Sequence, residues 1–115
     1  LVQNREQFWK MLTFYKENKA TICALGASTK GNVTLQTWEV SPNDITVIGD
    51  VNPDKDGSYT PGTWIPIASE EKVMEQEYDV YIVLPWHFKE FFVKNPKFKG
   101  KRLLFPLPTP EIVIP

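Results

Sequence analysis

A short apolar strand that runs directly into a glycine turn and a helix constrains this chain more than any other feature. Residues 21–25 are mostly apolar, residues 26–32 contain Gly26 and Gly31, and a helical pattern covers residues 29–39. Such a turn directs several backbone N–H groups at one point, and the helix that begins there adds about half a positive charge. The junction therefore favours an anionic group such as phosphate, and it makes nucleotide chemistry the first hypothesis to test.

The rest of the sequence alternates helical and strand patterns. We expect helices at residues 4–18, 29–39, 69–76 and 87–94, strands at residues 20–25, 45–49, 79–84 and 101–105, and a candidate edge strand at residues 112–114. Strands that alternate with helices form a parallel sheet covered by helices. The sequence thus predicts an α/β fold, a Rossmann-like three-layer domain with a mostly parallel sheet. We assign residues 1–19 to an N-terminal packing helix capped by Asn4, and residues 20–115 to the Rossmann-like domain.

A long connection rich in proline and glycine covers residues 51–66. Loops of this length inside a compact domain are uncommon and are usually functional or disordered. Tyr59, Trp64 and Ile65 favour a packed loop here. Two interpretations remain: the rim of a binding cleft, because the segment leaves the carboxyl end of a strand, or a surface excursion held by its aromatic side chains.

Composition excludes several classes of protein. The 115 residues suit one domain, and the net charge of −1 gives no basic face for nucleic acid. One cysteine, Cys23, and one histidine make a zinc site and an internal disulfide improbable. No apolar run approaches the roughly 20 residues that span a bilayer. We therefore expect a cytoplasmic location, no membrane and no metal, and the first residue, Leu1, suggests a piece of a longer protein.

The glycine turn partly matches the dinucleotide fingerprint G-x-G-x-x-G. Gly26, Ser28 and Gly31 fill its three glycine positions, and Asp50 ends the next strand, where a ribose-binding carboxylate is expected. Ser28 breaks the pattern at the point where backbone approaches pyrophosphate most closely. A P-loop is excluded because Asn32 stands where lysine is required. The alternative is a tight turn that needs glycine only for its φ angles.

Individual polar residues near this turn have two interpretations each. Ser28 and Lys30 either hold a phosphate or are solvated. Asp50 either accepts hydrogen bonds from sugar hydroxyl groups or caps a turn with Asn52. His87 follows a buried strand, at the edge where open α/β sheets place ligands, and it either contacts a ligand, acts as an acid or base, or packs at a helix start.

Several motifs occur in one order along the chain. They are LGASTKGN at residues 25–32, DVNPDK at 50–55, YTPGTWIPI at 59–67, LPWHF at 84–88 and FPLP at 105–108. Together they resemble the C-terminal domain of S-adenosylmethionine-dependent sugar C-methyltransferases, over roughly residues 20–114. Separate motifs in a fixed order are more specific than the glycine turn alone.

The resemblance implies a larger enzyme with a zinc-binding N-terminal domain, a central methyl-donor domain and this domain, which helps to hold a nucleotide-linked ketosugar. In such enzymes a base removes a proton next to the sugar carbonyl, and the enolate carbon takes the methyl group. The base and the donor pocket belong to the central domain. We therefore expect this chain to bind an NDP-hexose without catalysing alone, with S-adenosylmethionine bound outside it and no cofactor of its own.

The substrate-binding residues expected from the motifs and the fold rule belong to the turn, the following strand end, the long connection and the LPWHF motif. They are Gly26, Ala27, Ser28, Thr29, Lys30, Gly31, Asn32, Asp50, Asn52, Pro61, Gly62, Thr63, Pro85, Trp86 and His87. The expected partners are the nucleotide-linked sugar and the missing methyl-donor and zinc-binding domains. Two rival interpretations are an NAD-binding domain of an oxidoreductase and a non-catalytic interaction domain.

Overall fold

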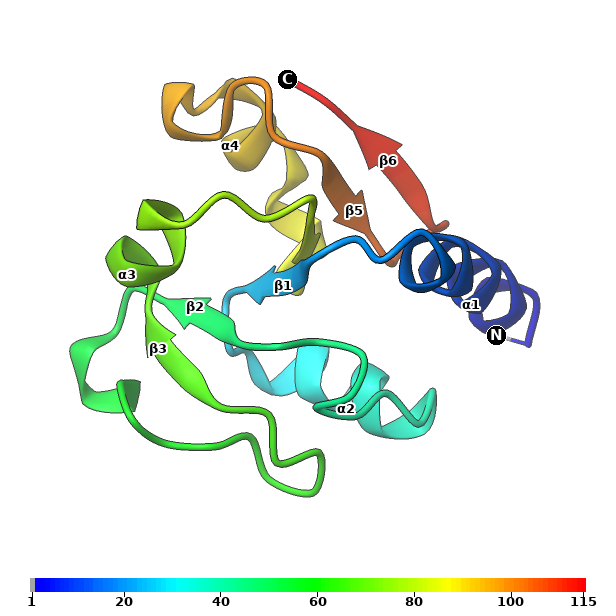
Figure 1. The fold of residues 1–115 in the computed structure, drawn as a ribbon, viewed down its shortest axis with the longest axis horizontal. Coiled ribbons are helices and arrows are strands. Elements are labelled where there is room, and N and C mark those ends of the chain that lie inside the picture. Colours follow the sequence, from blue (N-terminus) through cyan, green and yellow to red (C-terminus); the bar gives the residue numbers. More distant parts are fainter. Residues whose placement is uncertain (1) are drawn as a thin grey trace.

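The computed structural model of the protein describes residues 2–115. Its helices are α1 (Val2–Glu17), α2 (Thr29–Thr37), α3 (Glu70–Glu75) and α4 (Lys89–Lys94). Its strands are β1 (Ile22–Leu25), β2 (Ile48–Asp50), β3 (Ile67–Ser69), β4 (Val80–Val83), β5 (Leu103–Phe105) and β6 (Glu111–Val113). They form one sheet in the order β3-β2-β1-β4-β5-β6, parallel except for β6 (Figure 1). The predicted α/β fold with a mostly parallel sheet is confirmed.

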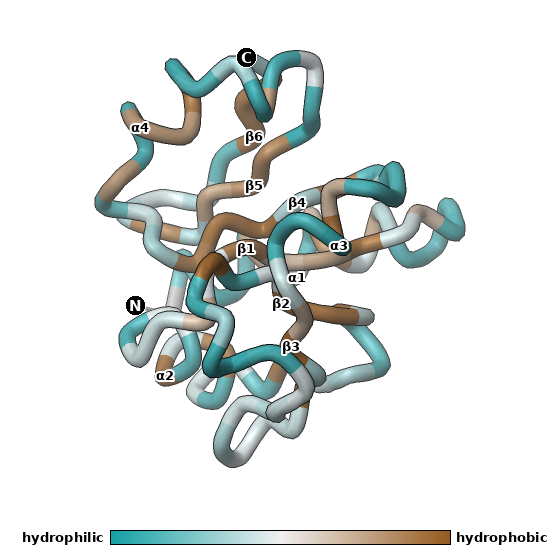
Figure 2. The backbone as a smooth tube through the Cα atoms, turned by 90° about the vertical axis from the view of Figure 1, so that its left-hand side faces the viewer, coloured by the Kyte–Doolittle hydropathy of each residue, from teal (hydrophilic) through white to brown (hydrophobic). Residues whose placement is uncertain are grey.

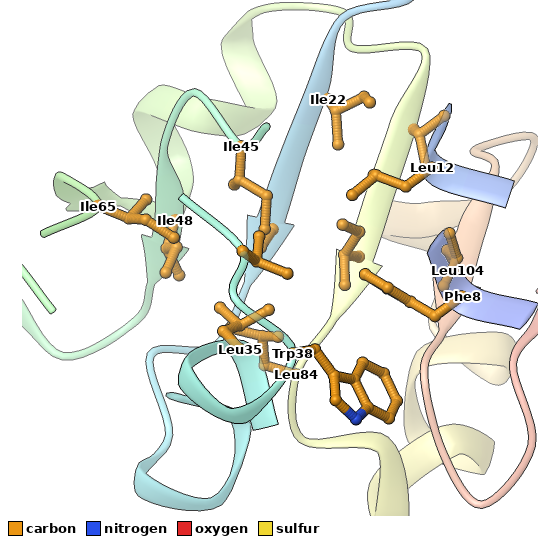
Figure 3. Close-up of a cluster of buried hydrophobic side chains, with 14 of the residues drawn as sticks. Phe8, Leu12, Ile22, Leu35, Trp38, Ile45, Ile48, Ile65, Leu84 and Leu104 are labelled. Atoms are coloured by element: carbon orange, nitrogen blue, oxygen red, sulfur yellow. The ribbon is translucent and has the colours of Figure 1, made fainter. Parts of the chain in front are cut away.

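Helices cover both faces of the sheet, which gives the three layers. Alternate residues of a strand point to opposite faces, and in β1 Ile22 and Ala24 join one buried cluster while Cys23 and Leu25 join another. The first cluster packs against α1 and α2, and Figure 3 shows it through Phe8, Leu12, Ile22, Leu35, Trp38 and Leu84. The second contains Val73 of α3 and Phe92 of α4. In Figure 2 the hydrophobic colour accordingly concentrates in the strands.

The strand order places a ligand-binding edge at β1 and β4. The chain runs from β1 outward to β2 and β3 and then returns to β4 on the other side of β1. Such a reversal is the topological switch point of a doubly wound sheet, where ligands bind outside the carboxyl ends of the strands. Gly26 follows β1 and Pro85 lies two residues after β4, so both lie at this point.

Two local expectations were wrong, and one strand was not anticipated. Asn4 does not cap the first helix, because α1 begins at Val2; its amide instead donates to the Pro108 carbonyl, 2.8 Å away. The strand β3 was not predicted, since three residues are too short to establish a periodicity. The expected helix at residues 87–94 is divided into a 3₁₀ turn, Trp86–Phe88, and α4.

The long connection at residues 51–66 is ordered without aromatic packing. Tyr59 and Trp64 are 58% and 68% exposed, so the expectation that aromatic side chains pack it is wrong. Ile65 is buried instead, a 3₁₀ turn forms at Pro53–Lys55, and Tyr59 bridges to Pro66. The segment therefore depends on one apolar anchor and on hydrogen bonds.

Candidate functional site

The two glycines of the β1–α2 turn are required by packing. Gly26 has φ +80°, and a Cβ there would lie 2.6 Å from Cδ of Pro85. Gly31 lies within α2, and a Cβ there would lie 2.5 Å from Cβ of Leu84. Gly26 therefore allows the tight turn, and Gly31 allows close contact between helix and strand. These are the roles of the first and third glycine positions in the dinucleotide fingerprint.

Ser28, at the middle position, caps α2. Its Oγ accepts a hydrogen bond from the Gly31 amide at 3.1 Å, which satisfies one of the amides left free at a helix start. The Asn32 amide bonds to the Ser28 carbonyl at 3.0 Å. Among residues 2–115, the amides of Thr29 and Lys30 then remain without a hydrogen-bond partner. The start of α2 can still receive an anion, through these two groups.

Asp50 anchors the turn. Its Oδ2 accepts a hydrogen bond from the Ala27 amide at 2.7 Å, and its Oδ1 accepts one from the Asn52 amide at 2.8 Å. Lys55 Nζ donates to the Ala27 carbonyl at 2.8 Å and lies 3.9 Å from Asp50 Oδ2. Of the two interpretations of Asp50, the contacts match the one in which it caps a turn with Asn52. The residue is only 9% exposed. Its carboxylate offers little surface to the ribose of a dinucleotide.

The long connection folds back onto α2 through Asn32. The Asn32 amide nitrogen donates to the Pro61 carbonyl at 2.9 Å, and Thr63 Oγ1 donates to Asn32 Oδ1 at 2.7 Å. Thr60 and Thr63 share a further hydrogen bond between their hydroxyl groups. At the tip, Gly62 has φ +78° and packs against the side chain of Gln36. The segment is therefore held beside the start of α2.

A hollow of about 270 Å³ lined mostly by residues with polar side chains, the polar hollow, lies between the turn and this segment. It is lined by Ala27, Ser28, Thr29, Asn32, Lys55, Ser58, Tyr59, Thr60, Pro61 and Ile67. Five of the residues expected from the sequence thus meet in one place. Hydroxyl, amide and ammonium groups beside an exposed tyrosine ring are the groups that bind sugars and phosphates.

Other expected residues lie elsewhere. Gly26, Asp50 and Pro85 line a separate, mainly apolar cavity of about 220 Å³ on the α4 side of the turn. Lys30, Gly31, Asn52, Gly62, Thr63, Trp86 and His87 line neither space.

His87 is exposed, and its ring contacts that of Trp86 edge to face and that of Phe88 at a tilt. Its ring centroid lies 5.9 Å from that of Trp86 and 4.3 Å from that of Phe88. Among the described residues its imidazole has no hydrogen-bond partner. No carboxylate therefore orients it as the base of a catalytic pair.

The sequence interpretation missed residues on both sides of the turn. Lys55, Ser58 and Thr60 line the polar hollow, and the sequence carried a signal for them, because they belong to or border the motifs at residues 50–55 and 59–67. Tyr59 also lines the hollow; its sequence context left open whether the ring stacks on a ligand or packs in the core. Phe91 and the residues after α4 line the apolar cavity. No local sequence pattern distinguishes them from ordinary surface and core residues, because they come to lie beside the end of β1 only in the folded structure.

The described residues contain no thiol nucleophile and no metal cluster. Cys23 is fully buried in β1, and burial raises the pKa of its thiol far above the usual range, so it remains a neutral core residue. Within residues 2–115, no three His, Cys, Asp or Glu side chains gather as metal ligands. No helix in that part of the chain is long and apolar enough to cross a bilayer.

Comparison with known proteins identifies similar sequences. The family model described as the C-methyltransferase C-terminal domain matches residues 1–108. Over 96 residues the chain is 30% identical to C-methyltransferase NovU of Streptomyces niveus. That alignment covers 81% of this chain and 23% of the relative, so the chain spans less than a quarter of that protein's length.

Proposed function

Because this chain belongs to the family of C-methyltransferase C-terminal domains, we propose that it holds a nucleotide-linked hexose for a larger S-adenosylmethionine-dependent enzyme. In this proposal the chain binds and orients the substrate and does not catalyse alone. The remaining parts of the enzyme, a methyl-donor domain and a zinc-binding domain, are its partners.

The polar hollow beside the start of α2 carries this proposal. Among residues 2–115, the Thr29 hydroxyl has no hydrogen-bond partner, and the Asn32 amide nitrogen keeps one N–H beyond its bond to Pro61. These groups suit the hydroxyl groups of a sugar, whereas the Thr60 hydroxyl is already bonded to Thr63 and Ile65. The exposed Tyr59 ring at the same hollow gives an apolar surface for a sugar face. Lys55 and the two free amides at the start of α2 favour the negative charge of a diphosphate.

The other expected residues keep supporting roles in the proposal. Residues 26–32 approach the sugar or the diphosphate. Asp50 and Asn52 form the polar end of β2, with Asp50 acting mainly by fixing the Ala27 amide. Residues 61–63 and 85–87 shape the rim. No proton transfer is assigned to this chain.

The residues present do not fit an adenosine-containing cofactor. Recognition of such a ribose at the end of β2 needs an acidic side chain with free oxygen atoms. Both oxygens of Asp50 accept backbone amides, and the residue is largely buried. We therefore propose that S-adenosylmethionine, which supplies the methyl group, binds outside this chain.

A ligand panel on the 115-residue chain tests the proposal. Thermal shift and calorimetry are measured with dTDP, dTDP-glucose, NAD and S-adenosylmethionine. We expect stabilisation by dTDP-glucose, because a ligand that binds only the folded state raises the free energy of unfolding, by about 2.7 kcal/mol at one hundred times Kd. Stabilisation by NAD alone would identify an oxidoreductase-type domain, and no response at any concentration would identify an interaction domain.

A pair of exposed aromatic residues supplies a matched control. Tyr59 lines the polar hollow and Trp64, in the same connection, does not. We expect Tyr59→Ala to weaken dTDP-glucose binding about tenfold, as expected for loss of an aromatic stacking surface, and Trp64→Ala to leave it unchanged. Equal effects of both variants would contradict the placement of the ligand.

A further inference from the structure

The apolar cavity on the α4 side of the turn has the character of a site for a flat ring. It measures about 220 Å³, and its walls include Gly26, Pro85, Phe91, Phe92 and Phe98. Phe92 and Phe98 are buried, but Phe91 is 61% exposed and lies at the same cavity. An exposed aromatic ring beside a mainly apolar cavity is a feature that proteins use to stack a nucleobase.

A few polar groups converge on the same cavity. Asn95 accepts a hydrogen bond from the Lys97 amide at 3.0 Å through Oδ1, and among residues 2–115 its amide nitrogen has no partner. Glu70, which is largely buried, pairs with Lys97 through Oε2, and its Oε1 has no partner in that part of the chain. A donor and an acceptor are therefore available to the edge of a base, which presents both kinds of group.

Charge differs between the two sides of the turn. Next to the apolar cavity lies an open hollow of about 610 Å³, which shares Asp50, Val51, Glu70 and Lys97 with it. This hollow adds Glu71 and Glu75, so carboxylates outnumber its single lysine. A diphosphate is repelled there. On the α2 side, Lys55 and the free amides of α2 attract it.

From these contrasts, and resting on the proposed function, we propose that the nucleotide-linked sugar lies across the turn at residues 26–28. The nucleobase occupies the apolar cavity and stacks on Phe91. The diphosphate passes over the start of α2, and the hexose occupies the polar hollow. Adjacent residues, Gly26 and Ala27, line the two spaces, and in this proposal the ligand crosses the turn between them.

Amide chemical-shift mapping on the 115-residue chain tests this orientation. The probes are thymidine, dTDP, dTDP-glucose and glucose 1-phosphate. We expect thymidine and dTDP to perturb Phe91, Asn95 and Lys97, glucose 1-phosphate to perturb Ser28, Thr29 and Thr60, and dTDP-glucose to perturb both groups.

Truncation of the stacking ring gives the second arm. Phe91→Ala removes an exposed side chain, so the fold is retained, and we expect it to weaken dTDP about tenfold while glucose 1-phosphate is unaffected. Phe14→Ala, which removes an equally exposed ring from α1, is the matched control and leaves both ligands unaffected.

The outcomes separate the two proposals. If dTDP-glucose binds and perturbs only the α2 side, or if Phe91→Ala binds dTDP normally, this orientation is overturned and the proposed function stands. If none of the four probes binds at millimolar concentration, the proposed function fails and the orientation fails with it.

Discussion

Two connections that leave neighbouring strands build the candidate site by different physical means. The β1–α2 turn is short, and its shape is set by steric contact, since Gly26 meets Pro85 and Gly31 meets Leu84 without room for a Cβ. The β2–β3 connection, residues 51–66, is long, and side-chain hydrogen bonds through Asn32, Thr60 and Thr63 hold it.

This difference predicts how each part of the site responds to change. Close-packed contacts in a protein interior cannot relax cheaply, whereas a hydrogen-bonded segment can exchange partners with water. The turn should therefore behave as a fixed wall of the site, and the long connection as an adjustable rim.

The largest effect is expected from Gly26→Ala. The change combines strain at φ +80° with overlap against Pro85, and we expect the free energy of unfolding to fall by about 3 kcal/mol. Gly57→Ala is the control in the long connection, because Gly57 has φ +83° with nothing within 4 Å of a Cβ. It should cost about 1 kcal/mol. If urea unfolding shows the same loss of unfolding free energy for Gly26→Ala and Gly57→Ala, steric contact does not distinguish the two connections.

Asp50→Asn tests the residue that joins both connections. It removes the charge that accepts the Ala27 and Asn52 amides, and we expect a loss of about 2 kcal/mol, as for hydrogen bonds to charged groups. Faster hydrogen exchange at the Ala27 amide should accompany it. Asp54→Asn, at an exposed position of the same connection, should change neither quantity. An unchanged exchange rate in Asp50→Asn would show that the anchor is not needed.

Thr63→Val tests the rim. The hydroxyl group bonded to Asn32 and Thr60 is lost while the shape is kept, and we expect a loss of about 1 kcal/mol. The substitution should weaken the binding of dTDP-glucose more than the binding of dTDP, because the long connection borders the polar hollow. Thr46→Val, at an exposed position before β2, is the control. If Thr63→Val weakens the binding of dTDP and of dTDP-glucose equally, the long connection does not act on the hexose in particular.

The smallest effect is a pH dependence from Cys23, in the strand that leads into the short turn. Burial raises the pKa of its thiol in the folded state, so this contribution to stability is complete below about pH 8.5 and is lost as the unfolded chain ionises above it. We expect the free energy of unfolding to fall by about 0.8 kcal/mol between pH 7 and pH 9. Cys23→Ala should lack this fall; if it shows the same slope, another group causes it.

The sequence predicted the parts of the site that are local. Strand β1, the turn and helix α2 were all anticipated, because an apolar run, two glycines and a helical pattern follow one another without a gap. The helix expected at residues 69–76 likewise forms as α3, and Ser69 caps it by accepting a hydrogen bond from the Lys72 amide at 3.2 Å. The aromatic packing of the long connection was predicted wrongly, because the local sequence does not show whether an aromatic side chain in a loop contacts the core or solvent.

The α/β class, the buried strands and the turn at the ligand edge follow from local sequence, because each depends on residues close together along the chain. The groups that surround that turn depend on the folded arrangement of distant segments. Lys55 reaches Ala27 across 28 positions. Phe91 in α4 and Lys97 after it line the same cavity as Gly26, which follows β1. The physical reason is that burial and charge at the edge are sums over segments distant in sequence, and only the packed sheet brings those segments together.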